Sequence, residues 1–220
     1  INLFADNEGR IETNINTSTK LDKNWSTMIY GHVSHNNFRK DFNNDGFMDN
    51  PLYTQYNLFN RWKYSDEHYE AQFGIHYIDE NRISGQMDFD IDEKRSADKP
   101  YGINIHNKRL QAFAKNGIIF HRPATSMALI NSFTLQDQNS FFGLRDYTAR
   151  QNSSYNNLIF QSYLGNTKHS YTTGLTYIYN NYDEMITDSS FSMKESVPGV
   201  YFQYTYSMPD KLTVITGIRA

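Results

Sequence analysis

Hydrophobic and polar residues alternate with a period of two along most of the chain. The clearest run is 69–77, where Tyr, Ala, Phe, Ile and Tyr share one parity and mostly polar residues take the other. This period puts successive side chains on opposite faces of a β-strand, so each run predicts a strand with two unlike faces. We find no convincing helical period. Further runs of this kind lie within 52–64, 127–135 and 200–208, and the segments 10–21, 103–115 and 158–164 alternate less cleanly.

The connections between the predicted strands have two lengths, and the two lengths alternate along the chain. In an up-and-down antiparallel sheet, this alternation places every short turn at one end and every long loop at the other, as in outer-membrane barrels. The short turns are predicted at 22–24, 65–67, 121–126, 166–168 and 209–210, and the long loops at 38–51, 81–101, 139–152 and 185–196.

The length of the predicted strands favours a membrane barrel. Strands of about 12 to 14 residues, tilted by about 40°, can cross an apolar layer roughly 25 Å tall. A water-soluble sandwich or lipocalin-like barrel would also alternate, but it does not account for long strands with alternating loop lengths. We therefore predict an all-β, antiparallel up-and-down transmembrane β-barrel, with about ten strands in this chain.

Composition adjusts this prediction. The chain of 220 residues has a net charge of -3 and no cysteine, so it has no thiolate site and no basic excess that would indicate nucleic acid. Its mean hydropathy of -0.71 is polar, yet it contains 17 Tyr and 15 Phe. No apolar run is long enough for a membrane-spanning helix. Aromatic residues recur near strand ends, where a membrane barrel has its interfacial girdle: Trp25, Trp62, Tyr64, Tyr69 and Tyr206.

One loop carries candidate metal ligands. Oxygen-bearing side chains occur at its first, third, fifth and ninth positions with Gly46 at the sixth, which is the spacing of a calcium loop. Leu52 stands at the twelfth position instead of glutamate, and strands flank the loop, so it is not an EF-hand. The alternative is a well-solvated Asp/Asn/Gly-rich turn. A bound calcium ion would hold the loop upright, with Phe47 and Met48 facing the barrel entrance. The predicted ligands are Asp41, Asn43, Asp45, Phe47 (through its carbonyl) and Asp49.

Other chemistry is sparse. The seven histidines are scattered without metal-ligand spacing, and His32 and His35 are expected to face opposite sides of one strand. An acidic run at 88–93 indicates a solvated loop, with an auxiliary cation site as the lesser alternative. We find no nucleophile elbow and no phosphate-binding glycine loop, so we expect no enzymatic activity.

Several segments, in this order along the chain, resemble the barrel of TonB-dependent outer-membrane receptors. No single segment is diagnostic, but the ordered set is fairly specific and covers nearly the whole chain. The segments are 41–49 with Pro51-Leu52, 55–57 with 60–64, 84–86, 101–103, 137–143, 197–206 and 211–219.

This resemblance implies the following. Residues 1–220 would be a partial barrel from a 22-stranded protein whose plug domain and energy-coupling box lie outside this sequence; Ile1 and Ala220 look like cut ends. The protein would reside in the outer membrane of a Gram-negative bacterium. It would bind and import a scarce nutrient such as a siderophore or other metal chelate, cobalamin or a glycan, energised by TonB. Its partners would be outer-membrane lipid, the TonB complex (through the absent parts), the nutrient, and a surface lipoprotein lid.

The residues leave alternatives open. The chain could be an outer-membrane β-barrel enzyme, a stand-alone ten-stranded barrel, or a soluble binding barrel. The sequence assigns no residue to a substrate site.

Overall fold

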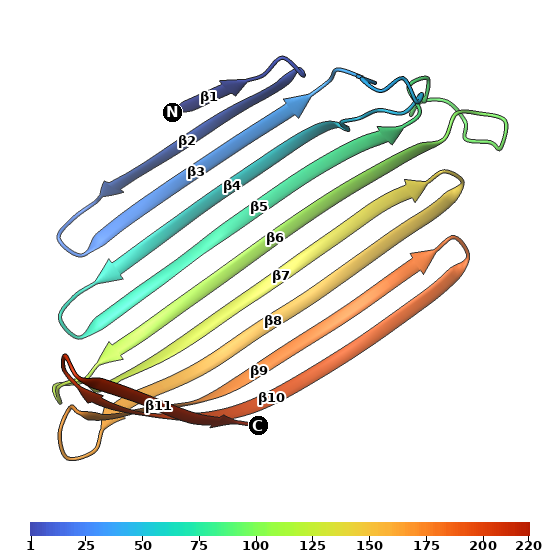
Figure 1. Cartoon of the computed structure of the whole chain (residues 1–220). Coiled ribbons are helices and arrows are strands. Elements are labelled where there is room, and N and C mark those ends of the chain that lie inside the picture. Colours follow the sequence, from blue (N-terminus) through green and yellow to red (C-terminus); the bar gives the residue numbers. More distant parts are fainter.

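The computed structural model describes residues 1–220 and is entirely β. Eleven strands form one antiparallel sheet in which each strand pairs with the next along the chain (Figure 1). The strands are β1 (Asn2–Ala5), β2 (Arg10–Lys20), β3 (Trp25–Asn36), β4 (Leu52–Ser65), β5 (Tyr69–Gly85), β6 (Gly102–Ile119), β7 (Ser126–Phe142), β8 (Arg145–Tyr163), β9 (His169–Ile186), β10 (Ser189–Met208) and β11 (Leu212–Arg219).

The sheet is held together by its backbone ladder. Of 156 backbone–backbone hydrogen bonds, 132 lie within the strands. Only three hydrophobic residues in the whole chain are buried: Met48, Ala71 and Phe89. The sheet is a single open layer with β1 and β11 at its edges, so the fold is barrel-like in strand order and direction without being closed. The structure has no helix with the length and apolar character needed to cross a membrane.

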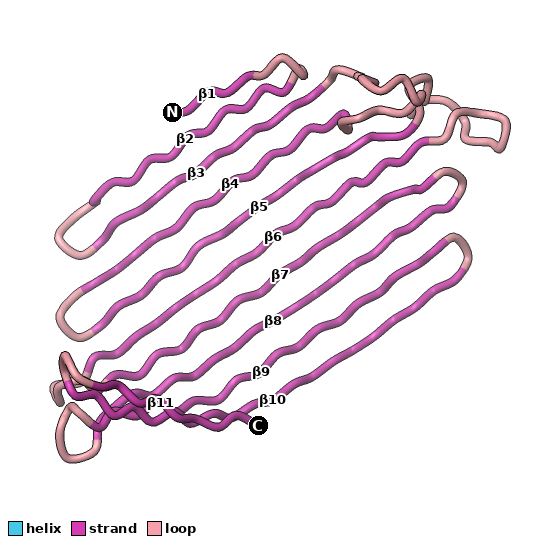
Figure 2. The backbone as a smooth tube through the Cα atoms, in the orientation of Figure 1, coloured by secondary structure: helices cyan, strands magenta, loops and turns pink.

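All connections lie at two ends of the sheet (Figure 2). At one end, called the turn end, are residues 21–24, 66–68, 120–125, 164–168 and 209–211. At the other, called the loop end, are residues 6–9, 37–51, 86–101, 143–144 and 187–188. All five predicted short turns therefore lie at one end of the sheet, as expected.

Two of the four predicted long loops were wrong. Residues 139–152 and 185–196 are strand for most of their length, and two-residue turns at 143–144 and 187–188 join them. Each face of these segments mixes polar with apolar residues, such as Phe141 and Phe142 or Met185 and Ile186. They therefore lack the apolar contrast between the two faces by which a strand is recognised in sequence. Gly143 and Thr187 have φ of 59° and 53°, the left-handed backbone that tight hairpins need. Likewise, β5 continues to Gly85 and shortens the second long loop to 86–101.

The strand count and strand lengths also differ from the prediction of about ten strands of 12 to 14 residues. Strand β1 has only 4 residues, too few for alternation to be detected. Strands β5 to β10 have 17 to 20 residues, because the polar extensions at the loop end continue the same ladder.

The strand register assigns every side chain to one of two faces, because directly paired residues point the same way. One face, which we call the band face, carries a belt of exposed apolar side chains across the sheet. It extends from β3 to β10 and is interrupted by single polar residues (Asn60, Asn116 and Asn131) and by a polar stretch at 152–156 on β8. The belt includes Ile29, Leu58, Phe73, Ile75, Leu110, Phe133, Leu158, Leu175, Val200 and Phe202.

This apolar belt crosses the strands obliquely. On β4 it ends toward the turn end at Tyr64, and on β10 it ends at Met208. The pairings lead from Tyr64 across the strands to Val200, so the belt has shifted by about eight residues, or roughly 26 Å. Six strand spacings amount to about 29 Å. The strands are therefore inclined by about 40° to the direction perpendicular to the belt, within the usual tilt of membrane barrels.

Candidate functional site

A polar hollow lies on the face opposite the band, at the loop end of β2 to β5. It has a volume of about 310 Å³, and only 1 of its 11 lining residues is hydrophobic. The turn between β1 and β2 and the loop 37–51 close its outer side through Glu8 and Asn50, whose side chains are hydrogen-bonded at 2.8 Å. The hollow is lined by charged and hydrogen-bonding groups, among them Glu8, Arg10, Glu12, Ser34, Tyr53 and Arg82.

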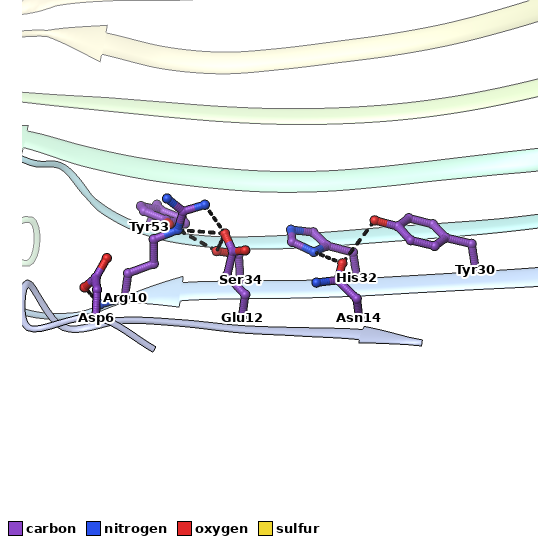
Figure 3. Close-up of polar contacts among 8 residues, drawn as sticks. All are labelled: Asp6, Arg10, Glu12, Asn14, Tyr30, His32, Ser34 and Tyr53. Atoms are coloured by element: carbon purple, nitrogen blue, oxygen red, sulfur yellow. Dashed lines mark hydrogen bonds and ion pairs between the residues drawn. The ribbon is translucent and has the colours of Figure 1, made fainter. Parts of the chain in front are cut away.

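A hydrogen-bonded network fixes the side chains of this hollow (Figure 3). Arg10 Nε donates to Glu12 Oε1 at 2.7 Å. The same oxygen lies 3.2 Å from the hydroxyl of Ser34, which is 3.1 Å from the hydroxyl of Tyr53. The register explains this contact, because Glu12 on β2 faces Ser34 on β3 directly. Ser34 is fully buried and so locks the centre of the network.

The network continues along the same two strands. Asn14 faces His32 across the β2–β3 pair, and His32 Nδ1 lies 2.7 Å from Asn14 Oδ1. The Tyr30 hydroxyl donates to the same amide oxygen at 3.2 Å (Figure 3). A row of polar groups therefore runs from the hollow down the face opposite the band.

The side chains that line the hollow are suited to hydrogen-bonding a small polar molecule. Arg82 lies over the ring of Tyr53, 5.6 Å from its centroid, and is paired with Glu80. Arg10 is paired with Glu12 in the same way. Fixed guanidinium, carboxylate and hydroxyl groups around a polar cavity can hydrogen-bond a small polar molecule from several sides.

The predicted calcium loop is compact, and its acidic side chains turn inward. The Asp41 carboxylate accepts hydrogen bonds from the backbone N–H groups of Asp45 at 3.2 Å and Gly46 at 2.9 Å. Asp45 accepts from the N–H of Phe47 at 2.8 Å, and Gly46 has the left-handed φ of 85° expected at the turn. The structure thus gathers Asp41, Asn43, Asp45 and Asp49 in one loop. The Asp49 carboxylate accepts a hydrogen bond from the Phe42 N–H, and the Asn43 amide donates one to the Asp45 carboxylate.

In this arrangement the carboxylates bind backbone amides. No group of three or more His, Cys, Asp or Glu side chains in the chain is placed to hold a metal ion. Calcium binding by Asp41, Asn43, Asp45, Phe47 and Asp49 therefore stays a prediction.

The expected orientation of Met48 was wrong. Its side chain is buried, and its N–H donates to the Gly85 carbonyl at 2.9 Å. Neighbouring Phe47 is half-exposed and forms a β-bridge with Gln86. Instead of facing an entrance together, these residues attach loop 37–51 to loop 86–101.

The two long loops consequently form one rim at the loop end. Met87 N–H donates to the Gly46 carbonyl at 2.9 Å, and Arg39 donates to the Met87 carbonyl at 2.6 Å. Within loop 86–101, a hydrogen bond from Lys99 to Glu93 at 2.8 Å raises the pKa of Lys99. The predicted acidic run lies in this loop.

Sequence reasoning placed His32 and His35 correctly on opposite faces of β3 but missed the polar hollow. His32 lies in the network, whereas His35 is on the band face and 2.8 Å from the hydroxyl of Thr54. The alternation of Arg10, Glu12 and Asn14 on one parity was the available signal for the hollow. This alternation indicated that one face of the strand is polar, but it did not show which neighbouring strands would place hydrogen-bonding side chains beside that face.

Comparisons with protein-family models, curated proteins and solved structures gave no match to this chain. The functional argument therefore depends on the arrangement of the chain's own residues.

Proposed function

We propose that this chain is part of the membrane-spanning barrel of a TonB-dependent outer-membrane receptor that binds and imports a scarce nutrient. The observation that carries the proposal is the oblique apolar belt on the band face. Its inclination of about 40° to the strands is what a belt parallel to a membrane produces on a tilted barrel wall. A soluble barrel has no reason to keep such a belt on its outer face.

The height of the belt fits a bilayer. On β5 it runs from Tyr69 to Tyr77, and the charged Asp79 follows on the same face. About nine residues at roughly 3.3 Å, inclined by about 40°, rise about 20 Å between terminal Cα atoms, close to the apolar band of roughly 25 Å on membrane barrels. So many exposed large apolar side chains on one face are unusual for a soluble monomer.

Aromatic residues mark the border of the belt at the turn end. Trp25 contacts Tyr64 and Phe73, with ring centroids 5.1 and 6.2 Å apart. Trp62 stacks on Phe73 at 6.5 Å, and Tyr64 lies 5.9 Å from Tyr69. All belong to the band face. Such a cluster supports the interfacial girdle expected from the sequence.

The opposite face supports a route for a polar ligand. In a closed barrel it would line the lumen, and the hollow around Arg10 and Glu12 would open at the loop end, outside the cell. A hydrophilic nutrient such as a metal chelate, cobalamin or glycan suits its hydrogen-bonding groups. Energy coupling by TonB would act through parts of the receptor outside this sequence.

Lipid-quenching fluorescence tests the membrane placement. The chain contains no cysteine, so single cysteines can be introduced at Leu58→Cys on the band face and Asn57→Cys on the opposite face, each carrying a small fluorophore. In bilayers with nitroxide-labelled acyl chains, we expect strong quenching at 58 and weak quenching at 57. Equal quenching at both positions would contradict the proposal.

A second set of measurements tests whether the chain is part of a TonB-dependent receptor. The intact gene should encode a plug domain and about a dozen further strands, since barrels of this transporter class have about 22. Uptake of the nutrient should stop when TonB is deleted. A gene encoding only about ten strands behind a signal peptide would instead favour a stand-alone barrel.

A further inference from the structure

Two histidine side chains meet at the turn end of the sheet. His68 lies in the turn between β4 and β5, and His121 lies in the turn between β6 and β7. Their ring centroids are 4.5 Å apart, with an angle of 41° between the ring planes. Strands β5 and β6 are neighbours, and the pairing of Tyr69 with Ile118 brings the two turns together. The spacing of the histidines in the sequence does not reveal this contact.

The two rings of this pair have no hydrogen-bond partner in the chain, unlike every other histidine. Each of the other five uses a ring nitrogen in a hydrogen bond to a neighbouring side chain. His68 and His121 are exposed, so each retains a nitrogen lone pair that can bind a ligand from solvent. The five hydrogen-bonded histidines are His32, His35, His76, His106 and His169.

Backbone contacts hold the two turns against each other. The His68 N–H donates to Asp66 at 2.8 Å, and the His68 carbonyl accepts from the Ile119 N–H at 2.8 Å. Arg122, next to His121, donates to the Tyr163 carbonyl at 2.8 Å and lies over the Tyr163 ring. Its positive charge is therefore held against β8 and leaves the histidine pair open to a cation.

We propose that His68 and His121 form a two-histidine chelate site for a first-row transition metal ion, with Cu²⁺ bound most tightly. Imidazole nitrogen suits Cu²⁺, Ni²⁺ and Zn²⁺ as a ligand, and among these ions the affinity of a nitrogen site is greatest for Cu²⁺. No third His, Cys, Asp or Glu side chain joins the pair, so water molecules would supply the remaining ligands. This site lies outside the proposed function and does not depend on it.

The separation of the two rings suits a shared ion. With metal–nitrogen distances of about 2.0–2.1 Å, an ion lies about 3.2 Å from the centroid of each imidazole that binds it. Two imidazoles bound at about 90–109° to each other then have centroids about 4.5–5.2 Å apart. The 4.5 Å between His68 and His121 falls within this range. Because both side chains are exposed, small χ rotations can direct one nitrogen of each ring at the same ion.

The test titrates CuCl₂, ZnCl₂ or MgCl₂ into the full-length protein in detergent, with binding measured by calorimetry. Electron paramagnetic resonance of the Cu²⁺ complex reports how many nitrogen atoms bind the ion. We expect Cu²⁺ to bind with two nitrogen ligands, Zn²⁺ to bind more weakly, and Mg²⁺, which prefers oxygen, not to compete. His68→Gln and His121→Gln should each weaken Cu²⁺ binding at least about tenfold, the lower limit for losing even an indirect partner of a metal ligand.

His169→Gln is the matched control. It removes a histidine at the same end of the sheet whose ring is hydrogen-bonded to Tyr204 at 2.5 Å, so it should leave Cu²⁺ binding unchanged. Urea unfolding without metal checks that all three variants fold. With Cu²⁺ present, the urea midpoint should rise in the parent and in His169→Gln but not in His68→Gln or His121→Gln, because the ion stabilises only a chain that binds it.

Several outcomes would overturn the site. These are no Cu²⁺ binding at all, equal binding by the parent and both pair variants, or a loss in only one of the two. An equal loss in His169→Gln would show non-specific binding by turn-end histidines and would overturn it as well. None of these outcomes affects the proposed membrane placement, which the cysteine quenching experiment decides.

Discussion

At the scale of single residues, Gly102 and Phe89 control how a loop packs on the sheet. Phe89 is 4% exposed, and its ring occupies the place where a side chain at Gly102 would lie, with the nearest ring atom 2.2 Å from a Cβ built there. The ring also contacts Phe141 on β7, with centroids 6.1 Å apart. One missing side chain thus lets loop 86–101 fold down onto β6 and β7.

Replacing this glycine should release the loop. Gly102→Ala forces the Phe89 ring out of its place, and we expect a loss of about 1–3 kcal/mol, typical of an overpacked site. Urea unfolding in detergent and limited proteolysis of loop 86–101 measure the effect. Gly117→Ala on the same strand is the matched control, because its Cβ would meet atoms only at 3.8 Å or more. Unchanged protease resistance in Gly102→Ala would show that the loop is held by other contacts.

The second prediction at the scale of single residues concerns calcium binding by loop 37–51. Asp45 offers a carboxylate at the fifth position of the calcium spacing and accepts the Phe47 N–H. We expect calcium to bind the intact protein with a Kd of about 0.1–1 mM, as in extracellular modules, and Asp45→Ala to abolish it.

Calorimetric titration in detergent measures this, with Asp88→Ala in the other long loop as the control. If both variants bind calcium as the parent does, or if none binds, loop 37–51 is a turn held by its own amides.

At the scale of elements, two of the five turn-end hairpins share the same hydrogen-bonded turn, in which an aspartate side chain accepts two backbone N–H groups. Asp22 accepts the N–H groups of Asn24 and Trp25, both at 2.8 Å. Asp66 accepts those of His68 and Tyr69 at 2.8 and 2.7 Å. In both turns the third residue after the aspartate is an aromatic residue that begins the next strand, so the turn also positions the aromatic border of the belt.

The hydrogen bonds of Asp66 predict that the stability of the folded protein depends on pH. The backbone hydrogen bond from His68, the Tyr64 hydroxyl and the Tyr69 amide lower the pKa of Asp66 below its ordinary value. Because the folded pKa is depressed, the stabilisation is complete above the unfolded pKa of about 4 and disappears as the pH falls through the folded pKa. We expect the urea midpoint in detergent to fall in that acidic range.

Asp66→Asn is the diagnostic variant, because its amide oxygen can accept the two backbone bonds from His68 and Tyr69 without titrating. Its midpoint should depend less on pH below about 4. Identical pH profiles for parent and variant would assign the acid sensitivity to other groups.

At the scale of the whole molecule, the sheet is a single layer without a core of its own. With only three buried hydrophobic residues, it gains little from apolar burial in water. Strands β1 and β11 each leave one edge unpaired, and unpaired edges promote aggregation. In the barrel that we propose, lipid on the band face and further strands at the edges would supply the missing stability.

The 220-residue chain alone should accordingly fail to fold as a monomer in buffer. We expect aggregation or a broad, non-cooperative thermal profile, measured by light scattering and circular dichroism without detergent. A sharp transition of monomeric protein would show that the sheet buries its belt by itself and would favour a soluble barrel.

Much of the fold could be predicted from local chemistry. Alternation from Tyr69 to Tyr77 predicted strand β5 and its apolar face, and Asp22 and Asp66 marked turns. The segments around Gly143 and Thr187 were misassigned because each of their faces mixes polar with apolar residues, so no regular alternation distinguishes the two faces. The candidate sites were predicted less well, since ligand spacing was visible for Asp41 to Asp49 but cross-strand partners were not.

The sequence alone determined the all-β class, the up-and-down antiparallel order and the separation of the two ends, because these follow from side-chain alternation and turn residues close in the chain. Only the tertiary structure decided the register. Register joins Glu12 to Ser34 in the polar hollow, aligns charged residues from Asp79 on β5 to Asp183 on β9 in one row across the strands, and inclines the apolar belt. Each of these joins residues on different strands, and a shift of one residue would move them to the other face.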